Sequence, residues 1–216
     1  MKKTPIHNTR NTTGIPRQIA AADICAVIGI SLLYVILEAS RAEKRWSFLA
    51  VGVAVAVCAI YLVVRRPHSW HDLGFRIDNL RAALLPIGSF TLAACVALVI
   101  WGLAHGQPAW TPQVGVLLAV YPAWAVVQQV AFQGLLHRGL MVLVRSPVLQ
   151  ILITAAAFAA VHAGNSTLVA LTFTAGLSWS LLYRRWPNIW LLAASHTILA
   201  ALVYPLVLKD APLSRL

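Results

Sequence analysis

The stretch VGVLLAVYPAWAVVQQVAFQGLL, residues 114–136, carries no charge, and its only amide side chains are Gln128, Gln129 and Gln133. It is long enough for an α-helix to cross a bilayer, which takes about 20 apolar residues. The apolar residues run continuously and do not alternate with polar ones, so the pattern favours a helix over a strand of a membrane barrel. We therefore predict a transmembrane helix that carries three buried amides.

The same pattern recurs along the chain. Hydrophobic residues make up 60% of the sequence and charged residues only 11%, whereas soluble domains carry about 25% charged residues. The alternative, a water-soluble helical protein with a very large core, does not explain several runs that approach bilayer length. We predict an all-α fold, a polytopic membrane bundle of about seven transmembrane helices, at Ile19–Leu37, Ser47–Val64, Ala82–Leu103, Val114–Leu136, Val148–His162, Thr167–Tyr183 and Ile189–Leu208.

The net charge of +11 does not indicate a nucleic-acid partner, because the basic residues follow the positive-inside rule. A cytoplasmic N-terminus places most of them, Arg138 included, in the cytoplasm. It leaves Arg41, Lys44, Arg45, Lys209 and Arg215 on the other side. The partner that this charge distribution indicates is the lipid bilayer.

Three regions are expected: a flexible cytosolic segment over residues 1–18, a membrane domain over 19–208 and a short tail over 209–216. A cleavable signal peptide in residues 1–42 is the less favoured alternative, because Asp23 interrupts the apolar run early. The loop 65–81 is predicted to be a solvated cytosolic connector in which aspartates pair with arginines. Cys25, Cys58 and Cys95 all lie inside spans and lack metal-ligand spacing, so we expect no disulfide, no metal and no cofactor.

The polar residues of the second half form the candidate site. Gln129 and Gln133 are four residues apart on one helix face, while His162 and His196 lie on two later spans. Polar groups inside a membrane span are costly and usually mark a site, although a single one often only bonds two helices together. No carboxylate occurs between Asp78 and Asp210. Two imidazoles alone are too few for a zinc site.

Three runs carry a resemblance to a known family. They are Gln128-Gln129-Val-Ala-Phe132-Gln133-Gly134, Phe158-Ala-Ala-Val-His162 and His196-Thr-Ile-Leu-Ala200. Their order and spacing resemble the CAAX protease and bacteriocin-processing (CPBP, or Abi) intramembrane proteases, whose motifs are Glu-Glu-x-x-x-Arg, Phe-x-x-x-His and His-x-x-x-Asn. Small residues at Ala155–Ala160 and around Gly176 suit close helix packing. The motif region is 114–208, and the family setting suggests a bacterial inner membrane.

The resemblance implies that one glutamate activates water, that two histidines hold the water or the oxyanion, and that the arginine pairs with a glutamate. His162 and His196 match these positions. Glutamines replace both glutamates at 128 and 129 and the arginine at 133, and Ala200 replaces the asparagine. The partner that the resemblance implies is a peptide or membrane-protein substrate, and Phe132, Phe158 and Asn165 are expected to contact it.

The substitutions leave a charge-neutral set that is able to hydrogen-bond within itself, and they predict that ordinary glutamate-based hydrolysis is weakened or lost. Asp23, Glu38 or a histidine are the alternative bases. The other interpretations are a non-catalytic binding or chaperone protein and, less favoured, a small transporter.

Overall fold

The computed structural model describes residues 15–39, 50, 52–55, 57–58, 61, 70–108 and 110–209. All regular structure in these residues is helical, which confirms the all-α prediction. The predicted span Ser47–Val64 lies largely outside them, as do most of the N-terminal segment, the C-terminal tail beyond Lys209 and the Glu38 side chain.

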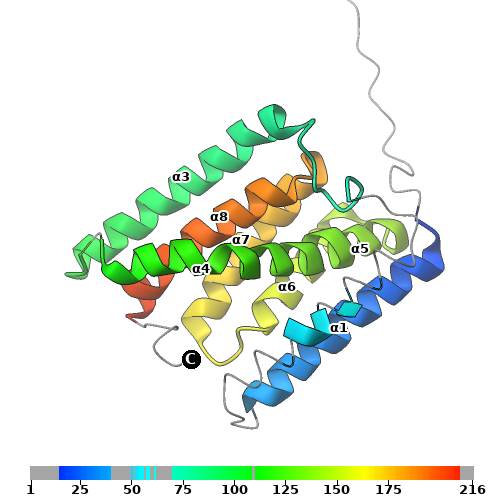
Figure 1. Ribbon diagram of the computed structural model, residues 1–216, viewed down its shortest axis with the longest axis horizontal. Helices are drawn as coiled ribbons and strands as arrows, with labels where there is room; N and C mark the ends of the chain where they lie inside the picture. The colour runs from blue at the N-terminus through cyan, green and yellow to red at the C-terminus, as the bar shows by residue number, and fades with distance from the viewer. Residues whose placement is uncertain are drawn as a thin grey trace, which may run out of the picture.

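From α3 onward the helices follow one another with short connections (Figure 1). They are α1 (Arg17–Ala39), α3 (Leu80–Ala104), α4 (Pro112–Gln129), the π-helix η1 (Val130–His137), α5 (Arg138–Leu143), α6 (Pro147–Ala160), α7 (Ser166–Arg185), α8 (Ile189–Val203) and the π-helix η2 (Tyr204–Leu208). Five segments are long and apolar enough to cross a membrane: Arg17–Leu37, Leu80–Ala104, Pro112–Leu143, Ser166–Arg185 and Ile189–Leu208. The helix α6 is apolar but shorter, as its sequence predicts.

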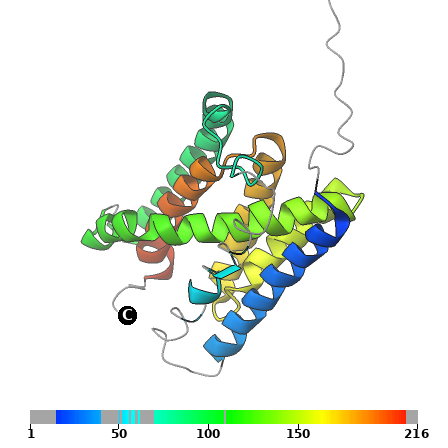
Figure 2. The same cartoon turned by 45° about the vertical axis from the view of Figure 1, so that its right-hand side comes forward.

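The fourth predicted span was wrong at its C-terminal end. Elements α4, η1 and α5 form one continuous helix, Pro112–Leu143, here called the central helix, which runs across the molecule in Figures 1 and 2. Arg138, expected in a cytosolic loop, is only 5% exposed. The charges of Asp72 and Asp23 both act on its guanidinium, and such nearby carboxylates are what make a buried arginine tolerable.

The other helices pack around the central helix. Helix α1 lies against α5, and α8 packs against both α4 and α3. Helices α6 and α7 approach closely: a methyl group added at Gly176 would lie 3.0 Å from the Cα of Ala155. The small residues at this crossing therefore act as the sequence indicates.

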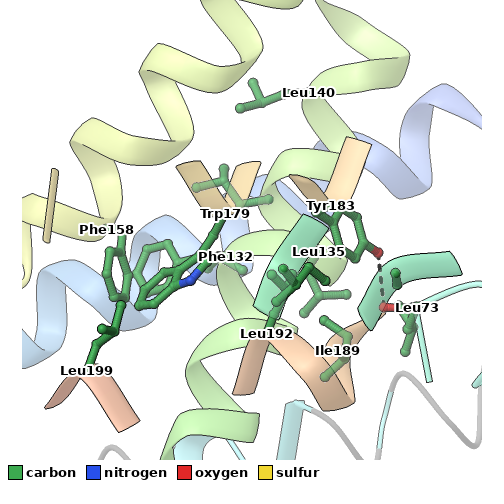
Figure 3. Close-up of a cluster of buried hydrophobic side chains, with 14 residues drawn as sticks. Leu73, Phe132, Leu135, Leu140, Phe158, Trp179, Tyr183, Ile189, Leu192 and Leu199 are labelled. Carbon is green, nitrogen blue, oxygen red and sulfur yellow. Dashed lines mark hydrogen bonds between the residues drawn. The ribbon is translucent and has the colours of Figure 1, made fainter. Parts of the chain in front are cut away.

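The loop between residues 70 and 79 is solvated only in part: Trp70, His71, Asp72, Ile77 and Asp78 are exposed, as predicted, whereas Leu73 and Gly74 are buried. Tyr183 donates a hydrogen bond from its hydroxyl to the Leu73 carbonyl at 3.0 Å, and Leu73 is only 7% exposed (Figure 3). Asn188 donates to the Arg76 carbonyl and to the Asn79 side chain, both at 2.8 Å. These bonds fix the loop to the turn between α7 and α8, because a buried backbone carbonyl needs a donor.

One ion pair expected in this loop is present. Arg76 and Asp78 approach to 2.5 Å, and the guanidinium lowers the pKa of the Asp78 carboxyl to about 2.

Candidate functional site

The structure brings two of the predicted site residues into contact. Gln129, at the end of α4, donates from its amide Nε2 to Nδ1 of His196 on α8 at 3.4 Å. Because Nδ1 accepts this bond, the imidazole proton is on Nε2, which lies 3.5 Å from the Tyr121 hydroxyl. Gln129 is 1% exposed and His196 is 4% exposed. The pair is therefore buried at the α4–α8 contact, with the imidazole neutral.

Gln133 lies one turn further along, inside the π-helix η1. Its Nε2 donates to the hydroxyl of Ser180 on α7 at 3.2 Å. Gln128 is half-buried, and its Oε1 has no hydrogen-bond partner among the described residues. Gln129 and Gln133 thus form hydrogen bonds with side chains on other helices and not with each other. π-Helical turns are rare and often occur at functional sites.

His162 lies just past the end of α6. Its Nδ1 is 2.9 Å from the Phe158 carbonyl, which can only accept, so Nδ1 is protonated and donates this bond. The Phe158 ring contacts both histidines edge-on, with centroid distances of 5.3 Å to His162 and 5.5 Å to His196. The two histidines thus flank one aromatic ring, as two groups that converge on a site would.

Phe158 belongs to an aromatic cluster that also contains Phe132 and Trp179 (Figure 3). Trp179 lies 4.8 Å from the His196 ring and donates to the Ser195 hydroxyl at 3.1 Å. The rings of Phe132 and Phe158 are almost fully buried. They form a rigid wall beside the histidines, and their contact with substrate stays a prediction.

Asn165 has a structural role. Its side-chain oxygen accepts from the Leu168 backbone N–H at 3.0 Å and so caps the N-terminus of α7. Asn165 is exposed to solvent or lipid. A contact between Asn165 and substrate also stays a prediction.

Sequence reasoning missed Tyr121, Trp179, Ser180 and Ser195 as neighbours of the histidines and glutamines. Each is a polar or amphipathic side chain inside a predicted span, the same signal that selected the glutamines. What the sequence lacked was the rotation of each helix, which decides whether such a residue faces the site or the lipid.

The charges around the site are sparse in the part of the chain that the structure describes. Asp23 is the buried carboxylate there, but it lies on α1, and its charge acts on Arg138. No group of three or more His, Cys, Asp or Glu side chains in the described residues is placed to hold a metal. The site as placed offers neutral amide and hydroxyl groups and the two imidazoles.

The comparisons with known proteins agree with the motifs. No curated protein and no solved structure matched the chain. One family model matched, described as type II CAAX prenyl endopeptidase Rce1-like, over residues 110–202. This interval contains Gln128, Gln129, Gln133, His162 and His196. The family resemblance expected from the motifs is thus confirmed for residues 110–202, where the chain is similar to these CAAX endopeptidases, and its long apolar helices are those of a membrane protein.

Proposed function

We propose that this protein binds a peptide or protein tail at the membrane and that glutamate-based hydrolysis is weak or lost. The observation that carries the proposal is the hydrogen bond from Gln129 to His196 at 3.4 Å. It lies at a motif position where the family resemblance implies a glutamate.

The chemistry of the amide supports this proposal. A glutamine side chain donates and accepts hydrogen bonds but takes no proton at ordinary pH. Loss of a positioned general base typically lowers a rate by about 10²- to 10⁴-fold. The amide also has no charge to stabilise an imidazolium at His196. The described residues thus hold and orient a substrate better than they activate water.

An apolar groove beside the site supports the binding of a tail. It has a volume of about 390 Å³ and lies between α4 and α8, the two helices that carry Gln129 and His196. Its walls include Pro122, Val126, Trp190, Ala193 and Ile198. A tail with apolar groups that occupied this groove would lie against the same two helices, on the outer side of the buried pair, because neither Gln129 nor His196 lines the groove.

The test measures binding and cleavage separately, with purified protein in lipid and tagged candidate tails. The variants are His162→Ala and His196→Ala, with His105→Ala as the control, because His105 is an exposed histidine at the end of α3. We expect wild type to bind at least one tail, with little or no cleavage, and His196→Ala to weaken binding while His105→Ala does not. Rapid cleavage by wild type that both site variants abolish would contradict the proposal and identify a protease that works without the glutamates.

A further inference from the structure

The buried face of the central helix carries a row of three polar residues, Gln129, Gln133 and His137, here called the acceptor stripe. They are spaced four residues apart, and each is at most 1% exposed. Each uses a donor atom to bind a different helix. Gln129 binds His196 on α8, Gln133 binds Ser180 on α7, and His137 binds Thr154 on α6. The stripe therefore lies where three helices meet the central helix.

His137 is the residue of this set that neither the motifs nor the proposed function uses. Its Nδ1 is 3.0 Å from the Thr154 hydroxyl. That hydroxyl donates its single hydrogen to the Gln150 carbonyl at 2.8 Å, so it must accept from the imidazole. His137 is fully buried, which favours its neutral form; the neutral ring then carries its proton on Nδ1 and a lone pair on Nε2.

Each member of the stripe has one buried atom with no hydrogen-bond partner in the described part of the chain. These atoms are Oε1 of Gln129, Oε1 of Gln133 and Nε2 of His137. All three are acceptors. A buried polar atom left without a partner typically costs about 1–3 kcal/mol, and most such atoms in proteins bind protein groups or ordered water. A row of acceptors selects a ligand that donates hydrogen bonds, and it disfavours an anion.

The spacing of the stripe fits water. Side chains four residues apart lie on the same side of a helix as neighbours, with their Cβ atoms about 5–6 Å apart. One water that donates both hydrogens joins two acceptors about 4.5–5 Å apart, because each bond is about 2.8–3.0 Å long and the two bonds diverge at about 105°, the angle between the hydrogens of water. The long, flexible glutamine side chains can bring neighbouring acceptors of the stripe to this separation. Buried waters commonly make about three such bonds to otherwise unpaired polar groups.

We propose that the acceptor stripe binds a short file of buried water. One molecule bridges Gln129 and Gln133, and one bridges Gln133 and His137. The file supplies water to the neighbourhood of His196 from inside the bundle. The proposal is independent of whether the protein cleaves a peptide bond, because it rests only on the unpaired acceptors and their spacing.

The test is water-edited solid-state NMR on the full chain in bilayers, with histidine and tryptophan labelled with ¹⁵N. Magnetisation passes quickly from water to a nitrogen that contacts it. We expect His137 to be the neutral Nδ1–H tautomer and to receive magnetisation nearly as fast as the exposed His105. The Trp179 indole, which donates to Ser195 inside the aromatic cluster, serves as the dry reference.

Two variants sharpen the result. Gln133→Met keeps the length of the side chain but removes its acceptor, so the transfer to His137 should slow severalfold. Thr174→Val is the control, because the exposed Thr174 hydroxyl only bonds the Ala170 carbonyl of its own helix. Transfer to wild-type His137 as slow as to Trp179 would overturn the proposal without any variant. Fast transfer that Gln133→Met leaves unchanged would overturn the bridging role of Gln133.

Discussion

Gly176→Ala tests whether the close crossing of α6 and α7 holds the aromatic wall of the site. The added methyl group would lie 3.0 Å from the Cα and 3.3 Å from the Cβ of Ala155, and 3.5 Å from the Phe158 ring. Favourable carbon–carbon contacts lie at about 3.5–4.0 Å. The two helices must therefore separate by about 0.5–1 Å. Overpacking of this kind typically costs about 1–3 kcal/mol.

The assay is thermal unfolding of purified protein in lipid nanodiscs. For a chain of this length, 1 kcal/mol shifts Tm by roughly 2–4 °C, so Gly176→Ala should lower Tm by roughly 2–12 °C. Gly88→Ala is the matched control: Gly88 is a helical glycine of α3, and a methyl group there meets nothing within 4 Å. Alanine favours a helix over glycine by up to about 1 kcal/mol, so the control should leave Tm unchanged or raise it. Equal shifts for the two variants would refute the packing argument.

Three further results are expected. Asn188→Ala removes the N-cap of α8 and two hydrogen bonds to the 70–79 loop, whereas Asn165→Ala removes only the N-cap of α7, worth about 0.5–2 kcal/mol. Thermal unfolding of the two variants should therefore show a larger loss of stability for Asn188→Ala. Tyr183→Phe leaves a loop carbonyl unpaired and should cost about 1–3 kcal/mol and speed proteolysis of the loop. The pKa of Asp78 is lowered to about 2 by Arg76, so its contribution to stability is present above about pH 4 and is lost as the pH falls toward 2; acid unfolding of Asp78→Asn should lack this component.

The transmembrane helices could be predicted from the sequence because bilayer length and the absence of charge leave few other structures. The C-terminal end of the central helix could not be predicted, because a charged residue such as Arg138 is typical of a loop. Only the fold shows that the charges of Asp23 and Asp72 act on it. The attachment of the loop 70–79 to α7 and α8 could not be predicted for a similar reason. Its polar sequence suggests solvent, whereas Asn188 and Tyr183, more than a hundred residues away, bind its carbonyls.

The candidate site was partly predictable. Polar residues in apolar spans identified Gln129, Gln133 and His196, and the structure places all three in buried hydrogen bonds between helices. The same signal did not indicate which partner each one binds. Ser180 and His137 occupy the same buried region, but a single serine or histidine in a span is usually a packing residue, so neither stood out.

Peptide cleavage by wild type and by the triple variant Gln128→Glu/Gln129→Glu/Gln133→Arg tests the central claim most directly. The variant restores the charged residues of the family motif. We expect wild type to bind the tail with little turnover, and the triple variant to cleave it about 10²- to 10⁴-fold faster, in a reaction that an added His196→Ala abolishes. Wild-type cleavage as fast as that of a correctly folded triple variant would show that the glutamines do not limit hydrolysis and would contradict the account.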